Sequence, residues 1–226
     1  MLVLLRHGES ALNAEGRFSG WADCPLTPKG VRQAREAGRV LRDAGVAFDA
    51  CFTSVLSRTK DTAAIVLGEM GLADLPVTPA CQLNERHYGT LEGALRGETV
   101  ERYGAAQVEA WRNAPDETPP PLDDDDMRHP RLQPLYRGVA QECLPSSECL
   151  REVFRRVTEF FDGEIRPLVE SGRRILVVSH GNPIRGLVAY LERLPAGEVP
   201  VIGIENAAPI VYLPGFTRVM VVEVLK

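Results

Sequence analysis

Residues 2–8 read LVLLRHG, and residues 175–181 read ILVVSHG. In both stretches a short apolar run, of the kind that forms a buried parallel strand, leads into His-Gly. His7 and His180 therefore follow two strands, and in open α/β sheets ligands bind at the carboxyl ends of strands. Either histidine alone is compatible with an ordinary strand end, but the repeated pattern predicts one site that contains both.

The rest of the chain alternates strands with helices. Further strands are predicted at 50–53 and as a closing hairpin of 210–213 and 218–225, and 77–83 is predicted to be extended. Thr27-Pro28 is typical of a helix start, and helices are predicted from there to Gly45 and at 58–70, 97–113, 147–169 and 182–192. This alternation predicts a three-layer α/β/α fold with a mostly parallel central sheet.

The length of 226 residues fits one domain that spans residues 1–226. A Pro/Asp-rich stretch at about 115–134 interrupts the alternation and contains the run Asp123–Asp126. We interpret this stretch as a loop excursion from the domain, because the segments on both sides belong to the same core. Four consecutive aspartates cannot all point inward, so no metal site is expected there.

Composition indicates a cytoplasmic protein. The apolar runs are too short to cross a bilayer, and the first residues lack the pattern of a signal peptide. The five cysteines have neither metal-site nor disulfide spacing, which favours reduced thiols. The net charge of −5 gives no indication of a nucleic-acid partner, and we expect no membrane contact.

Histidine pairs of this kind suit phosphoryl transfer. A neutral imidazole is a nucleophile that can form a covalent intermediate with a phosphoryl group, and transfer then needs alignment and positive charge around the phosphoryl oxygens. Arg6, beside His7, and Arg58, at the start of a helix, can supply that charge without a metal. His180 adds a further cation if it is protonated.

Proton transfer to the substrate oxygen needs an acid, and Glu85 is the best candidate. It follows the extended segment 77–83, and a carboxyl group beside a phosphate dianion favours its protonated form. By itself, a glutamate in a loop is normally just solvated, so this choice depends on the wider motif.

Several motifs together resemble the cofactor-dependent phosphoglycerate mutases of the histidine phosphatase superfamily. The main one is RHGES at residues 6–10, followed by Asn13 and by RFSGW at residues 17–21. TSVL at 53–56, LNERHYG at 83–89 and HGN at 180–182 extend the match over most of the chain. Arg-His-Gly alone would indicate only the superfamily.

The resemblance implies a role for each matched residue. His7 would be the phosphorylated nucleophile, Glu85 the proton donor and acceptor, and Arg6, Arg58 and His180 the phosphate pocket. The substrate site would be lined by Ser10, Asn13, Ser19, Gly20, Arg86, Tyr88, Arg96, Arg112, Asn113, Gly181 and Asn182. His87, His129, Trp21 and Trp111 are expected to be structural.

The resemblance also implies an activity and a cofactor. Members of this family interconvert 3-phosphoglycerate and 2-phosphoglycerate, need 2,3-bisphosphoglycerate to prime the histidine, and use no metal. The partner is then a small phosphorylated acid, and the resemblance leaves a homodimer or homotetramer open.

Four departures from the family pattern bear on the substrate. Arg96 replaces a usual lysine, Asn113 replaces the second of two adjacent arginines, and Glu205 puts a carboxylate near the expected site. The chain also ends at Lys226, without the further tail that covers the site in many mutases. A lid excludes water, so without one hydrolysis competes with transfer.

Three functions follow from these observations. The first is a phosphoglycerate mutase, and the second is a phosphatase or mutase that acts on another small phosphorylated acid. The third is a binding module without catalysis, which is disfavoured because His7, Glu85 and His180 are all present.

Overall fold

The computed structural model describes residues 1–195, 199 and 202–220. Its centre is a six-stranded sheet in the order β3-β2-β4-β1-β5-β6. The strands β1 (Leu2–Arg6), β4 (Ile175–Ser179), β2 (Ala50–Thr53) and β3 (Val77–Pro79) are parallel. The strands β5 (Pro209–Leu213) and β6 (Thr217–Val219) add an antiparallel hairpin beside β1. The mostly parallel sheet and its closing hairpin are confirmed.

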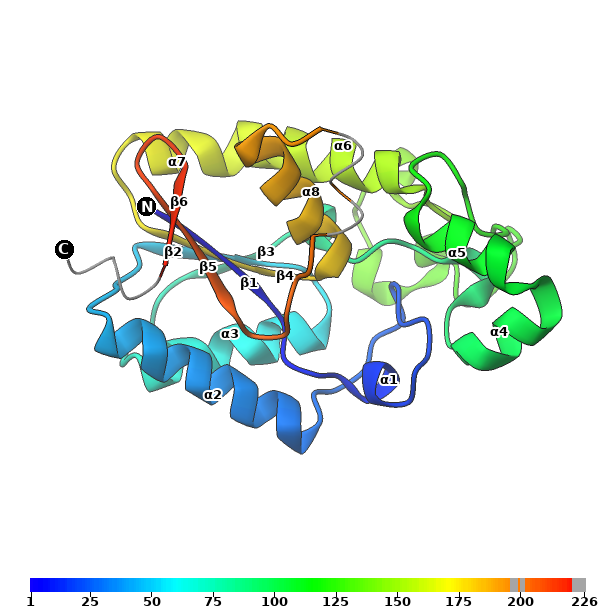
Figure 1. Cartoon of the computed structure of the whole chain (residues 1–226), viewed down its shortest axis with the longest axis horizontal. Helices are drawn as coiled ribbons and strands as arrows, with labels where there is room; N and C mark the ends of the chain where they lie inside the picture. Colours follow the sequence, from blue (N-terminus) through cyan, green and yellow to red (C-terminus); the bar gives the residue numbers. More distant parts are fainter. Residues whose placement is uncertain (196–198, 200–201, 221–226) are drawn as a thin grey trace.

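Helices cover both faces of this sheet (Figure 1). On one face lie α2 (Pro28–Asp43) and α3 (Ser57–Glu69), and on the other lie α6 (Leu150–Phe160), α7 (Arg166–Glu170) and α8 (Gly181–Glu192). Side chains of a strand alternate between faces, so Val3 and Leu5 pack with α2 and α3, whereas Leu2 and Leu4 pack with α6 and α8. The predicted three-layer α/β/α fold is confirmed.

Two predicted helices are interrupted. The segment 97–113 forms α4 (Arg96–Tyr103) and α5 (Ala105–Asn113), because Gly104 adopts a positive φ of 83° between them. The segment 147–169 begins as a helix only at Leu150, and a π-helical turn at Phe161–Ile165 separates α6 from α7. Pro167 has no N–H to continue the α-helical pattern, which accounts for this wider turn.

The extended prediction for 77–83 is only partly right, because β3 ends at Pro79 and a 3₁₀ turn follows at Cys81–Leu83. In the C-terminal hairpin, β6 ends at Val219, and residues 221–226 lie outside the described residues. None of the five cysteines forms a disulfide. Among the described residues, no helix is long and apolar enough to span a bilayer.

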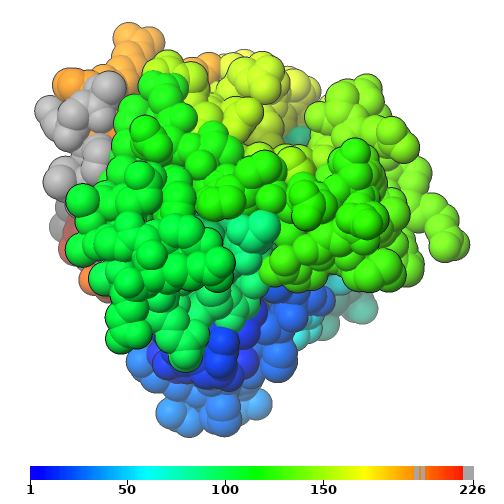
Figure 2. All heavy atoms as spheres, turned by 90° about the vertical axis from the view of Figure 1, so that its right-hand side faces the viewer, coloured from blue at the N-terminus to red at the C-terminus, as the bar shows by residue number. Residues whose placement is uncertain are grey.

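The excursion at 115–134 lies beyond the carboxyl ends of the parallel strands, together with α4 and α5 (Figure 1). It continues to residue 149 through three 3₁₀ turns at Pro130–Leu132, Pro134–Tyr136 and Gln141–Cys143. Figure 2 shows this end of the molecule, where the green segment that holds α4, α5 and the excursion covers much of the surface. Two short elements, α1 (Ala11–Ala14) and a 3₁₀ turn η2 (Gly89–Leu91), also lie at this end of the molecule.

The start of α2 packs directly against the loop that follows β1. The Thr27 hydroxyl caps α2 by accepting from the Gly30 N–H at 3.0 Å. A Cβ atom on Gly8 would overlap with the carbonyl oxygen of Gly30. Glycine at position 8 therefore allows the backbone beside His7 to lie against the helix.

We predict that Gly8→Ala lowers the free energy of unfolding by about 1–3 kcal/mol, as overpacking of a close-packed interior does. Gly68→Ala is the matched control, since an added methyl group there meets nothing within 4 Å. The control should be neutral or raise the free energy of unfolding by up to about 1 kcal/mol, because alanine favours the helix. Urea unfolding measures both, and equal effects of the two substitutions would contradict the close approach.

Candidate active site

His7 and His180 lie side by side at the carboxyl ends of two adjacent strands. Arg6 pairs with Ser179 in the register of β1 and β4, and the histidine that follows each strand points to the same place. The ring centroids are 4.9 Å apart with an interplanar angle of 66°, and both side chains are buried. The structure therefore brings together the two histidines that the sequence pattern paired.

The hydrogen bonding of His7 leaves one nitrogen for chemistry. Its Nδ1 lies 2.6 Å from the carbonyl oxygen of Gly8, which can only accept, so Nδ1 carries the hydrogen and Nε2 keeps its lone pair. Burial, together with the positive charges of Arg58 and Arg6, holds the pKa of His7 well below its ordinary value. His7 is thus a neutral imidazole at neutral pH, which is the form a nucleophile needs.

His180 is held by Ser54, whose hydroxyl oxygen lies 2.8 Å from Nε2. Its pKa is also well below the ordinary value, through burial and the charges of Arg58, His7 and Arg6. His180 is consequently neutral in this structure and does not add the further cation that its protonated form would supply. A phosphate dianion beside it would favour its protonated form.

Arg58 and Arg6 are held by backbone carbonyls. Arg58 is fully buried and donates from Nη1 to the Ala22 carbonyl at 2.9 Å and from Nη2 to the Gly20 carbonyl at 2.7 Å. Arg6 donates from Nη1 to the Ile204 carbonyl at 2.7 Å. Both guanidinium groups are thereby oriented, and within the described part of the chain neither forms an ion pair with a carboxylate at contact distance.

Three buried polar atoms of this group have no hydrogen-bond partner in the described part of the chain. They are Nε of Arg6, Nε of Arg58 and Nδ1 of His180. Buried polar groups in folded proteins are nearly always hydrogen-bonded, and such exceptions call for an explanation. The two arginine Nε donors near His7 fit the oxygens of a phosphoryl group.

Glu85 lies close to the first turn of α8. Its Oε1 accepts from the backbone N–H of Arg86 at 2.8 Å and from that of Asn182, in the first turn of α8, at 3.3 Å. Both its carboxyl group and the guanidinium of Arg6 lie close to Gly181. A carboxyl group is therefore placed next to the expected phosphoryl position.

A pocket of about 250 Å³ opens beside these groups. Ten of the predicted site residues line it: Arg6, Asn13, Ser19, Glu85, Tyr88, Arg96, Arg112, Asn113, Gly181 and Asn182. Arg96 and Arg112 are exposed, so they stand where the pocket opens to solvent. A larger groove of about 890 Å³ beside α6 and α8 has no histidine among its described lining residues, so volume alone does not locate the site.

Three residues predicted to line the substrate site form hydrogen bonds within the protein. Arg86 is fully buried and donates to the carbonyls of Glu148, Glu117 and Trp111. These hydrogen bonds join the excursion to the core. Ser10 donates from its hydroxyl to Asn13 Oδ1 at 3.0 Å and so orients that side chain. Gly20 contributes its carbonyl to Arg58. Like His7, Arg58 and His180, these three are not among the residues that line the pocket.

Glu205 is exposed and is not among the residues that line the pocket. The contact with the site comes from its neighbours instead, because Asn206 Nδ2 donates to the His7 carbonyl at 2.7 Å and the Ala207 N–H donates to the Arg6 carbonyl at 2.9 Å.

Sequence reasoning missed Phe18 and Arg185, which also line the pocket. Arg185 donates from Nη1 to Asn182 Oδ1 at 3.2 Å. The available signal was its spacing, since residues three apart lie on one face of a helix and Asn182 was already a candidate. With Arg185 the pocket has four arginines, a lining suited to an anionic ligand. Among the described residues, no cluster of histidine, cysteine and carboxylate side chains could hold a metal ion.

A buried, neutral histidine among unpaired arginine donors defines a site for phosphoryl groups. Consistent with this geometry, residues 2–215 match the model of the histidine phosphatase superfamily (branch 1), and the chain belongs to that superfamily. It is 47% identical over 211 residues to the 2,3-bisphosphoglycerate-dependent phosphoglycerate mutase of Nitratidesulfovibrio vulgaris (strain DSM 19637 / Miyazaki F). The aligned residues cover 93% of this chain and 85% of that protein.

Two solved structures are similar over nearly the whole chain. Bacillus stearothermophilus YhfR has a TM-score of 0.71 at 26% identity, with 98% of this chain and 95% of that chain covered. The alpha-ribazole phosphatase from Shigella flexneri has a TM-score of 0.69 at 28% identity, with 97% and 94% covered.

We predict that His7 and His180 remain neutral at pH 6.5, because burial and the neighbouring arginines lower both pKa values. Side-chain ¹⁵N NMR should show His7 with its hydrogen on Nδ1, and inorganic phosphate should raise the pKa of His180. His87 is the internal control, since its pKa of about 3 reflects burial away from the pocket. An imidazolium at His7 at pH 7 without phosphate would contradict this assignment.

Proposed function

We propose that this protein interconverts 3-phosphoglycerate and 2-phosphoglycerate as a 2,3-bisphosphoglycerate-dependent phosphoglycerate mutase. The observation that carries the proposal is the 47% identity to a curated mutase of that kind across 93% of the chain. The pocket agrees with it in chemistry, since arginines gather both at the buried end, with Arg6, and at the open end, with Arg96 and Arg112. Such a lining suits a small acid with a phosphoryl group and a second anionic group.

In this proposal His7 is the nucleophile. 2,3-bisphosphoglycerate supplies the phosphoryl group that primes His7 at Nε2. The free hydroxyl of 3-phosphoglycerate then forms a bond to this phosphorus while the bond from phosphorus to Nε2 breaks, and Glu85 takes the hydroxyl proton. The bisphosphate reorients, the Nε2 lone pair forms a bond to its other phosphorus while the bond from that phosphorus to the substrate oxygen breaks, and Glu85 gives its proton to the departing oxygen.

The arginines account for the stabilisation of the transferring group. In phosphoryl transfer, negative charge spreads over the equatorial oxygens, and fixed cations stabilise it without reorganisation. Nε of Arg6 and Nε of Arg58 are donors available for those oxygens, because neither has a hydrogen-bond partner among the described residues. Asn182, Tyr88, Arg96, Arg112 and Arg185 would bind the rest of the substrate.

A second function is favoured by Asn113, which lines the pocket but donates its amide to Glu109. One cation fewer at the open end weakens the hold on a second anionic group. On that reading the protein is a phosphatase, or a mutase, for another small phosphorylated acid. We also propose that it acts in the cytoplasm as one domain over residues 1–226, and that a homodimer or homotetramer is compatible with its activity.

We expect rapid formation of 2-phosphoglycerate when the protein meets 3-phosphoglycerate and a trace of 2,3-bisphosphoglycerate in the presence of EDTA. His7→Ala should abolish the reaction, and Glu85→Gln should slow it by about 100- to 10,000-fold, the usual contribution of a general acid. The assay follows 2-phosphoglycerate and free phosphate together. Phosphate release with little isomer would favour the second function, and loss of activity in EDTA would contradict metal-independent transfer.

Arg185→Ala should lower kcat/KM for 3-phosphoglycerate by about 10- to 100-fold, because a hydrogen bond between charged partners is lost. Arg155→Ala is the matched control, since Arg155 is exposed on α6 and does not line this pocket. Steady-state kinetics of both variants check the assignment. Equal kinetics for the two would remove Arg185 from the substrate site.

A further inference from the structure

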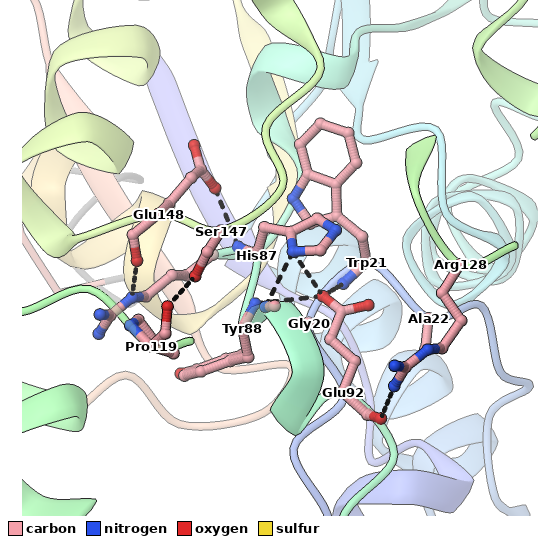
Figure 3. A network of polar contacts seen from close by, with 12 residues as sticks. Gly20, Trp21, Ala22, His87, Tyr88, Glu92, Pro119, Arg128, Ser147 and Glu148 are labelled. Atoms are coloured by element: carbon pink, nitrogen blue, oxygen red, sulfur yellow. Dashed lines mark hydrogen bonds and ion pairs between the residues drawn. The ribbon is translucent and has the colours of Figure 1, made fainter. Parts of the chain in front are cut away.

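Glu92 is a buried carboxyl group that follows η2 and does not line the pocket. Figure 3 shows it between Trp21, His87 and Arg128. Its Oε1 accepts from the backbone N–H of Trp21 at 2.7 Å and from that of Tyr88 at 3.2 Å. A Cβ atom on Gly20 would overlap with this carboxyl group, so Glu92 lies directly against the peptide between Gly20 and Trp21.

That peptide links Glu92 to Arg58. Its N–H, from Trp21, donates to Glu92, and its carbonyl, from Gly20, accepts from Arg58 Nη2 at 2.7 Å. In a planar trans peptide the N–H and the C=O point in opposite directions, so the carboxylate and the guanidinium lie on opposite sides of it. Hydrogen bonds that share a peptide in this way polarise and strengthen one another.

The indirect link suits a phosphate-binding arginine better than a direct ion pair would. A carboxylate in contact with Arg58 would occupy two of its N–H groups and offset its charge. Here the Gly20 and Ala22 carbonyls orient the two terminal nitrogens, and Nε stays without a partner among the described residues. The charge of Arg58 is thus held in place and left available.

The same turn also reaches the candidate acid. The Trp21 indole is 2% exposed, and its Nε1 donates to the Glu85 carbonyl at 2.6 Å. Residues 20–22 therefore contact both a phosphate-pocket arginine and the residue proposed to transfer protons. A group that fixes this turn can influence both.

We propose that Glu92 is a positioning residue for phosphoryl transfer: its carboxylate holds the Gly20–Trp21 peptide and, through that peptide, keeps Arg58 oriented with Nε toward the phosphoryl group. The inference deepens the proposed function and rests on it, since Arg58 matters only if a phosphoryl group binds beside His7. Glu92 itself touches no reacting atom.

Glu92 changes charge in the neutral range, which makes the link testable. Burial raises the pKa of Glu92 to about 7, against the opposing effect of the Trp21 and Tyr88 N–H groups and of the charges of Arg58 and Arg128. His87, whose Nδ1 lies 3.5 Å from Oε1, has a pKa of about 3 through burial and is neutral throughout. Among the described residues, the titratable or charged groups around this network also include Arg58, Glu85, Tyr88, Arg128, His129, Tyr136, Glu148 and Arg156.

The experiment compares the wild type with Glu92→Gln, which keeps the shape and the acceptor but not the charge. The dissociation constant for inorganic phosphate is measured by calorimetry at pH 6 and pH 8, and kcat/KM for mutase activity is measured at both values. At pH 8 the variant should bind phosphate about tenfold more weakly, and kcat/KM should fall by about the same factor, since a charge-assisted hydrogen bond becomes a neutral one. At pH 6 the two proteins should converge, because Glu92 is protonated in the wild type.

At each pH we compare the variant with the wild type as the ratio of their dissociation constants and as the ratio of their kcat/KM values. The ionisation of phosphate and of His180 affects both proteins alike, so it does not change these ratios. Glu98→Gln, which removes an exposed charge on α4, is the matched control, and its ratios to the wild type should be one at both pH values. A loss that is the same at both pH values would reduce Glu92 to a structural role, and tighter phosphate binding by the variant would overturn the proposal. If the wild type binds phosphate but has no mutase activity, the proposed function fails, while the binding ratios still test Glu92.

Discussion

The pairing of β1 with β4 is the constraint on which the site depends. Two parallel strands in register end at the same edge of the sheet, so the residue after each strand faces its counterpart. That is why His7 and His180, 173 positions apart in the chain (180 − 7), lie with their rings 4.9 Å apart. Glycine follows each histidine, and at Gly8 the helix α2 approaches so closely that no side chain fits.

The second constraint is buried positive charge. Arg58 is fully buried, and its neighbour Arg6 is partly buried, yet both are held by carbonyls rather than by carboxylates. Buried charge without a direct counter-ion is costly, and proteins that keep it generally do so for function. Together with burial, these charges lower the pKa of His7. In the proposed function the same charges would also stabilise the transferring phosphoryl group.

The pocket combines residues from distant parts of the chain. The end of β1 and the segment that follows it contribute Arg6, Asn13 and Ser19, and the segment after β3 contributes Glu85 and Tyr88. The helices α4 and α5 contribute three further residues, and α8 contributes Asn182 and Arg185. Arg86 and Arg156 join these segments through backbone carbonyls, including that of Glu85. The excursion is therefore tied to the segment that carries Glu85 through the bond from Arg86 to the Glu117 carbonyl, although none of its residues lines the pocket.

The sequence by itself determined the strands and the pair of histidines, because apolar runs, helix caps and His-Gly motifs are local signals. The other candidate residues of the pocket came from the resemblance of its motifs to a known family. It did not determine how each polar side chain is used. Arg86 and Arg185 are both arginines in or beside a motif, yet one donates to three carbonyls and the other lines the pocket. Glu92 and Gly104 show the same limit, since only packing decides that a carboxyl group is buried or where a helix breaks. Hydrogen-bond partners and burial arise when distant segments meet, and the tertiary structure alone sets them.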